Sequence, residues 1–236
     1  YNFIPKQAYI FMINDYILAL KQLGDPRLWK PVIWATIFSL FTLLLLVFLS
    51  TGVTGLIFDF IFSYFDSYEK DSWLRIGVQS IAFVFLFLLG FFFFGSLQAA
   101  FLGLYIDDVI DAVHSKHYPT TSLRPPPKVM TSIIISVRLV GLSFLVNFLA
   151  APLFFLGWFF PPLGIAMQVI VNGFLLGREY KTVLRERLSE ENYKPSQSFT
   201  QHGAIGSALF MVPGLNFVAP LLICVSIQHA MMKPKN

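Results

Sequence analysis

The stretch PVIWATIFSLFTLLLLVFL, residues 31–49, decides the class of fold. It contains no charged side chain and is close to the ~20 consecutive apolar residues that a helix needs to cross a bilayer. A second uncharged stretch, residues 76–106, is longer. At about 1.5 Å per residue its helix reaches about 46 Å, so it has to tilt or protrude from a hydrocarbon layer of about 30 Å. Two long transmembrane helices are predicted.

The composition is typical of a protein whose main solvent is lipid. Of 236 residues, 56% are hydrophobic and only 13% are charged, and 27 are phenylalanine. A soluble domain of this size has too little polar surface to cover so many large apolar side chains. The net charge of +4 comes from scattered cations, whereas a nucleic-acid-binding protein gathers them on one face. We therefore predict an all-α integral membrane protein that binds no nucleic acid.

Proline and glycine interrupt both of the remaining apolar regions, 139–177 and 195–232. The interruptions are Gly157 with Pro161 and Pro162 in the first region, and Pro213 with Gly214 in the second. The resulting pieces of about 10 to 18 residues are at or below the usual length of a span. Re-entrant helical hairpins are therefore predicted. Broken backbone at membrane depth has to be covered by protein, so we expect a homo-oligomer or contacts with other membrane subunits.

The whole chain is predicted to form one membrane domain, in which the polar segments alternate with the apolar ones. The segments are an interfacial helix at 1–30, transmembrane helices at 31–49 and 76–106, a polar linker at 107–128, a broken hairpin at 129–177, a basic amphipathic segment at 178–194 and a broken hairpin at 195–236. Placing the first segment on the cytoplasm-like side leaves only Lys70 and Arg75 opposite, as the positive-inside rule favours, with Arg138 left over beside an apolar segment. A bacterial or a mitochondrial inner membrane fits this pattern.

The sequence IDDVID, residues 106–111, contains the DDxxD arrangement that holds magnesium and diphosphate in prenyl-transfer enzymes. A lipid-acting enzyme built on Asp107, Asp108 and Asp111 is one hypothesis. An isolated short motif has a high false-positive risk, and no second acidic cluster appears at the end of another apolar helix. The favoured interpretation is a solvated helix end. No catalytic residue, metal or cofactor is predicted.

The spacing of the histidines does not indicate a metal site. His114 and His117 lack further ligands at zinc spacing and are interpreted as surface residues. His202 and His229 lie in or beside apolar segments. For both, a hydrogen-bonded residue at the interface is the favoured interpretation. A proton relay is the alternative, because ionisable groups in membranes are often functional.

Basic residues at the ends of apolar segments are the candidates for binding an anion. GDPRLWKP, residues 24–31, puts Arg27 and Lys30 before the first transmembrane helix, where free N–H groups and the helix dipole favour an anion. Plain anchoring at the interface is the alternative. GREYKTVLRERL, residues 177–188, reads as a basic helix that contacts headgroups, or as one in which Arg178 binds an anion or pairs with Glu179 or an aspartate of IDDVID.

The predicted site residues fall into two sets. The predicted anion-binding residues are Gly24, Arg27, Lys30 and Arg178. Neutral donors can hold an anion without trapping it, and those predicted along a pathway are Asn147, Gln168, Asn172 and Asn216.

Four segments resemble one known family, the CysZ-type sulfate permeases with the related etoposide-induced-protein-like membrane proteins. They are LYIDDVIDAVHSKHYP at 104–119, LVNFLAAPLF at 145–154, NGFLLGREY at 172–180 and VPGLNFVAPLLICVSIQHAM at 212–231. The alphaproteobacterial branch is the most similar. The resemblance implies two long transmembrane helices, partly inserted hairpins and an oligomer. The family's Gly-hydrophobic-Arg-Arg motif is matched loosely by Gly24, Arg27 and Lys30, without the adjacent arginine pair.

Two functions are compatible with these features. The leading hypothesis is a permease or channel for sulfate or a similar inorganic oxyanion, without enzymatic activity. The alternative is a non-catalytic structural subunit of a larger membrane complex, a role that a mitochondrial descendant of the alphaproteobacterial branch would allow.

Overall fold

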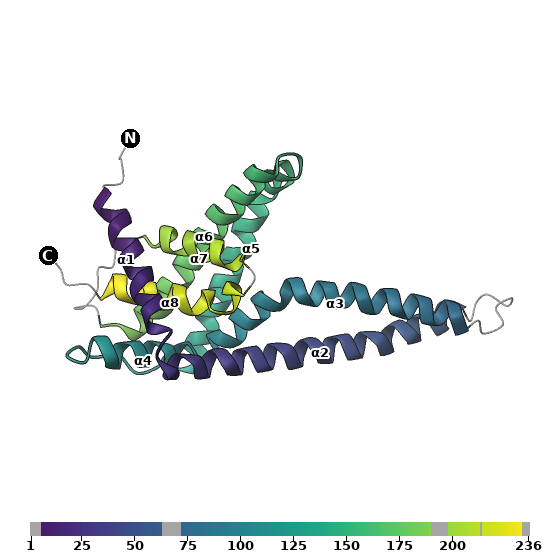
Figure 1. The fold of residues 1–236 in the computed structure, drawn as a ribbon, viewed down its shortest axis with the longest axis horizontal. Helices are drawn as coiled ribbons and strands as arrows, with labels where there is room; N and C mark the ends of the chain where they lie inside the picture. Colours follow the sequence, from purple (N-terminus) through teal and green to yellow (C-terminus); the bar gives the residue numbers. More distant parts are fainter. Residues whose placement is uncertain (1–5, 63–71, 190–197, 213, 233–236) are drawn as a thin grey trace. The chain divides into compact units, whose positions relative to one another are not determined.

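The fold is built from helices throughout the part of the chain that is described. The computed structural model describes residues 6–62, 72–189, 198–212 and 214–232, and the side chains of most of them. The elements are α1 (Lys6–Gln22), α2 (Pro26–Phe62), α3 (Ser72–Gly103), α4 (Ile106–His117), α5 (Val129–Phe159), α6 (Pro161–Arg187), α7 (Thr200–Phe210), the short 3-10 helix η2 (Leu215–Phe217) and α8 (Ala219–Met231) (Figure 1). Residues 33–103 form one compact unit, and residues 1–32 with 104–236 form another.

The unit of residues 33–103 contains most of α2 together with α3. Ala35 and Ser39 of α2 and Gln98 of α3 are fully buried, and the rings of Phe38 and Phe101 stack with centroids 5.8 Å apart. Most other side chains described here are apolar and exposed, which suits a lipid environment.

Among the described residues, two helices are long and apolar enough to cross a membrane, judged by length and composition. They are Pro26–Leu56 in α2 and Val129–Gly157 in α5. The first contains the predicted transmembrane helix at 31–49. The second predicted transmembrane helix, 76–106, coincides largely with α3, where the apolar stretch identified among the described residues is Ile76–Phe87. For the part of α3 after Phe87, the transmembrane helix remains a prediction.

The first predicted hairpin has a much longer first arm than expected. The chain turns at Phe160, and Pro161 starts α6, a position where the missing N–H and fixed φ of proline suit a helix. The turn therefore lies within the predicted interruption. However, α5 is one helix of 31 residues that passes through Arg138 and Pro152. The expected piece of 10 to 18 residues is wrong for this arm, because a single arginine and a proline do not end the helix.

The second predicted hairpin consists of short helices, as expected. α7 has 11 residues and α8 has 13, and Pro213 lies outside the described residues. Gly214 has φ +87°, a conformation that glycine adopts at little cost, and this explains the interruption between the two helices. Every residue of α8 is buried, so α8 forms the centre of its unit.

Glycines bring α6 and α7 into direct backbone contact. A Cβ added to Gly203 would lie 2.0 Å from the carbonyl oxygen of Gly173 and 2.5 Å from the nitrogen of Gly177. Close approach of this kind through residues spaced by four is the way small residues pack helices in membranes. The same device operates between α5 and α6, where a Cβ on Gly157 would lie 2.5 Å from Cα of Gly164.

The predicted interfacial helix, α1, packs one face against α8 (Figure 1). That face is buried and partly polar. Asp15 lies 3.2 Å from Nε2 of His202 on α7, and Gln22 lies 2.6 Å from Nε2 of His229 on α8. Nδ1 of His229 is 2.6 Å from the hydroxyl of Tyr118. Both histidines are thus hydrogen-bonded groups inside the unit, and they join α1 to the two short helices.

Candidate functional site

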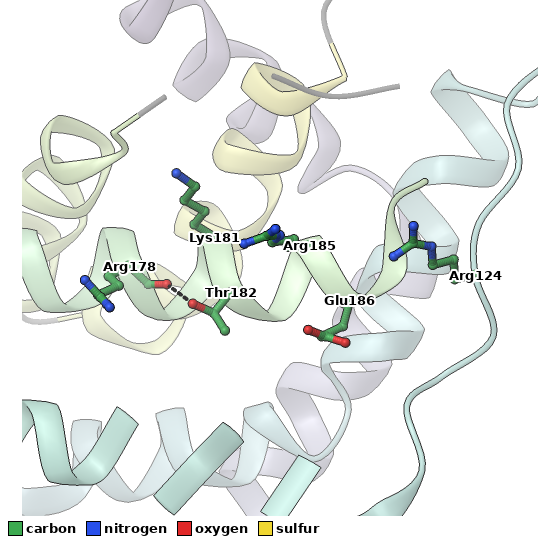
Figure 2. A pocket seen from close by; sticks show the side chains of 6 residues that line it. All are labelled: Arg124, Arg178, Lys181, Thr182, Arg185 and Glu186. Atoms are coloured by element: carbon green, nitrogen blue, oxygen red, sulfur yellow. Dashed lines mark hydrogen bonds between the residues drawn. The ribbon is translucent and has the colours of Figure 1, made fainter. Parts of the chain in front are cut away.

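The basic half of α6 forms one wall of a pocket of about 460 Å³. Figure 2 shows the side chains along α6, with Arg124 reaching in from the loop after α4. The lining residues are Arg124, Arg178, Lys181, Thr182, Arg185 and Glu186. Residues three, four and seven positions apart share one face of a helix, which is why Arg178, Lys181, Thr182 and Arg185 line the same pocket.

Backbone contacts bring Arg124 to this pocket. The N–H of Arg124 donates to the carbonyl of Arg187 at 2.7 Å, and Leu123 forms an isolated bridge with Leu188. The loop after α4 is therefore held against the last turn of α6. No local sequence pattern marks Arg124 as a pocket residue, because its position depends on this long-range pairing.

A buried arginine fixes the end of α6 to α4. Only 3% of the Arg187 side chain is exposed, and its guanidinium lies 2.6 Å from Asp107 and also binds Asp111. Asp108 and Asp111 are exposed and Asp107 is half-buried, as expected for the solvated helix end predicted for IDDVID, and two of these aspartates also neutralise Arg187. The suggested pairing of Arg178 with an aspartate of IDDVID is not the pairing in the structure: Arg187, which faces inward, makes it.

The pocket has an excess of positive charge. Among the described lining residues there are four cations and one carboxylate, Glu186, which leaves a formal charge of +3. Burial lowers the pKa of Lys181, and the neighbouring Arg185 and Arg178 lower it further. The Lys181 ammonium also lies 5.9 Å from the ring centroid of Phe199. Such a cluster repels itself, and an anion between the cations would relieve the repulsion.

The predicted anion site at the start of α2 already has a carboxylate partner. Arg27 donates to Asp25 at 3.0 and 3.2 Å, and Lys116 of α4 donates to the same carboxylate at 3.3 Å. Arg27 and Lys116 lower the pKa of Asp25, so it is ionised at neutral pH. An external anion has to compete with Asp25 here. Of the predicted anion-binding residues, Arg178 lines the pocket on α6, and Gly24, Arg27 and Lys30 are not among its lining residues.

The predicted pathway amides are spread over three elements. Asn147 on α5 is exposed and donates to the carbonyl of Ser143 at 2.8 Å. Gln168 and Asn172 lie on α6, exposed and half-buried respectively. Asn216 lies in η2, and its Oδ1 is buried without a hydrogen-bond partner among the described atoms. None of the four is among the residues lining the pocket on α6, so their role stays a prediction.

The described part of the chain contains no cluster of side chains suited to a metal ion. Among those residues, no three or more His, Cys, Asp or Glu side chains lie close enough together to hold an ion. Cys224 is buried and free. Asp107 and Asp111 bind Arg187 instead, which gives the acidic motif a structural role.

His114 should make the stability of its unit fall in mild acid. Burial lowers its pKa, and Arg187 lowers it further while Asp111 opposes the decrease. An unfolded imidazole titrates near ~6.5. Below that pH the unfolded chain binds a proton that the folded chain resists, so stability decreases as the pH falls from about 7.5 to 5.5.

The control for this prediction is His114→Gln, which can keep the contact that His114 Nε2 makes with Thr121 at 2.8 Å. Thermal unfolding of both proteins should be followed at the two pH values. We expect a smaller acid-induced decrease in Tm for the variant. Equal decreases in both proteins would contradict a contribution from His114.

The described residues form an all-helical fold with two helices long and apolar enough to cross a membrane, and a cationic pocket lies beside α6. A family model described as Sulfate transporter CysZ/Etoposide-induced protein 2.4 matches residues 16–220. The chain belongs to this family, a transporter-type family, and the resemblance of the four segments is confirmed. Comparisons with curated proteins and with solved structures found no match.

Proposed function

We propose that this protein is a permease for sulfate or a similar inorganic oxyanion, without enzymatic activity, in a bacterial or mitochondrial inner membrane. The observation that supports it most is the pocket on α6, whose described lining includes one carboxylate, Glu186, and four cations: Arg124, Arg178, Lys181 and Arg185. Arginine offers planar, bidentate hydrogen bonds that suit tetrahedral oxyanions. Thr182, whose hydroxyl donates to the carbonyl of Arg178, adds a neutral oxygen to the lining.

The pocket is suited to be an entry site. Its cations are on the side that the positive-inside pattern assigns to the cytoplasm or matrix. Three of them lie near the C-terminal end of α6, the helix that begins at the hairpin turn. We further propose that Asn147, Gln168, Asn172 and Asn216 act along the pathway as neutral donors, since an anion held only by neutral groups can leave again. Arg27 and Lys30 would raise the local anion concentration at the start of α2.

The test is uptake of radiolabelled sulfate into proteoliposomes by the wild type and by Arg178→Gln/Arg185→Gln. A hydrogen bond to a charged group contributes ~1.5–3 kcal/mol, and every 1.4 kcal/mol is tenfold. We therefore expect the initial rate at sub-saturating sulfate to fall at least about tenfold. Lys128→Gln is the matched control, because Lys128 is an exposed cation of the same unit that is not among the pocket residues.

The outcomes separate the permease from its rival. A control that transports like the wild type, beside a slow double variant, supports the permease. Equal uptake by the wild type, the double variant and protein-free vesicles would reject it. Co-purification with a stoichiometric set of other chains would then favour the structural subunit.

A further inference from the structure

The cations that line the α6 pocket have fewer neighbouring carboxylates than Arg187, the next arginine on the same helix. Arg187 is buried and is matched by two carboxylates, Asp107 and Asp111. Arg178 and Arg185 are on the exposed side of the same helix, and the described lining of their pocket includes four cations and one carboxylate, Glu186. The inward-facing arginine is thus neutralised by the fold, whereas among the described residues that line the pocket the cations outnumber the carboxylates, which favours an anion from outside the chain.

The size of the pocket indicates whether it takes a free oxyanion or an oxyanion group of a larger molecule. Its volume is about 460 Å³. A bare tetrahedral oxyanion fills only part of such a space. Pockets of ~300–1,000 Å³ usually take an organic ligand, so the space suits an oxyanion group together with the polar body that bears it.

The distribution of charge along α6 fits a pocket at the surface of a membrane. From Pro161 to Gly177 the helix has no charge, and from Arg178 onward it is strongly basic. The uncharged part is about 25 Å long at ~1.5 Å per residue. With this part in the hydrocarbon layer, the cations that follow it lie at the level of the lipid phosphates, where basic residues attract anionic headgroups.

We infer that the α6 pocket binds the phosphate group of an anionic phospholipid, and that lipid phosphate and free oxyanion compete for Arg178, Lys181, Arg185 and Arg124. The inference rests on the proposed function, since it assumes that the pocket is an oxyanion site. The shared chemistry is a tetrahedral oxyanion held by guanidinium and ammonium groups. The consequence is regulation: an anionic lipid in the pocket lowers the apparent affinity of the permease for sulfate.

The experiment uses the delipidated full chain in a neutral detergent and native mass spectrometry. Phosphatidylglycerol and phosphatidylcholine with the same acyl chains are added separately to the wild type, Arg178→Gln/Arg185→Gln and Arg178→Lys/Arg185→Lys. For the wild type we expect at least tenfold preference for phosphatidylglycerol. The glutamine variant should lose it, and the lysine variant, which keeps the charge, should retain it within about threefold while also showing that substitution here leaves the protein folded.

A second arm distinguishes the two sources of the oxyanion. Sulfate added at increasing concentration should displace phosphatidylglycerol from the wild type. No preference for the anionic lipid, or an equal preference in the glutamine variant, overturns the inference even where sulfate binding depends on the pocket. Pocket-dependent lipid binding in a protein that binds no sulfate supports lipid recognition and overturns the proposed permease instead.

Discussion

Gly203→Ala should severely destabilise the unit that contains the pocket. The added Cβ would lie 2.0 Å from the carbonyl oxygen of Gly173 and 2.5 Å from the nitrogen of Gly177. Both are backbone atoms of α6, so no side-chain rotation relieves the clash. Overpacking a core costs ~1–3 kcal/mol when side chains can adjust, and we expect about 3 kcal/mol or more here because α6 and α7 have to separate.

The measurement is thermal unfolding in detergent, followed by circular dichroism. A loss of about 3 kcal/mol corresponds to a Tm lower by about 6–12 °C for a chain of this length. The matched control is Gly141→Ala, also inside a helix, where an added Cβ meets nothing within 4 Å and helix propensity favours alanine by up to ~1 kcal/mol. A Gly203→Ala protein as stable as the control would contradict the close contact of α6 with α7.

Arg187→Gln should produce the second large loss of stability. It removes two charge-assisted hydrogen bonds, to Asp107 and Asp111, and leaves two carboxylates beside each other. Breaking a fully buried pair costs ~3–5 kcal/mol. The aspartate side chains are 37% and 54% exposed and water can solvate them in part, so we expect a smaller loss of about 2–3 kcal/mol.

Arg185→Gln is the control for this prediction. Arg185 is on the same turn of α6 but exposed, and exposed substitutions usually change stability by about 0.5 kcal/mol or less. The Tm of Arg187→Gln should therefore fall by about 4–12 °C while that of Arg185→Gln stays near the wild-type value. Equal Tm values for the two variants would show that Arg187 does not hold α6 to α4.

Local signals in the sequence predict the order of the apolar helices and two of the breaks between them. The uncharged run at 31–49 lies within α2, and the breaks at Pro161 and Gly214 coincide with the end of α5 and with the start of η2. The length of α5 is missed because Arg138 looks like the edge of an apolar segment. The start of a helix cannot be predicted from one charged residue, because a single arginine is compatible with the interior of a helix.

The candidate site is only partly predictable for a different reason. The spacing of Arg178, Lys181 and Arg185 predicts a basic helix face, and that face lines the pocket. The partners of this face come from elsewhere in the chain: Arg124 through the carbonyl of Arg187, and α4 through the Arg187 side chain. Such pairings join residues about sixty to eighty positions apart, and helical periodicity contains no information about them.

Calorimetric titration of sulfate into the purified, delipidated protein at low ionic strength tests the central claim most directly. The wild type should bind sulfate saturably, and Arg178→Gln/Arg185→Gln should bind it at least about tenfold more weakly, with Lys128→Gln unchanged. The same affinity for sulfate in the wild type and the double variant would contradict the assignment of the α6 pocket as the oxyanion site.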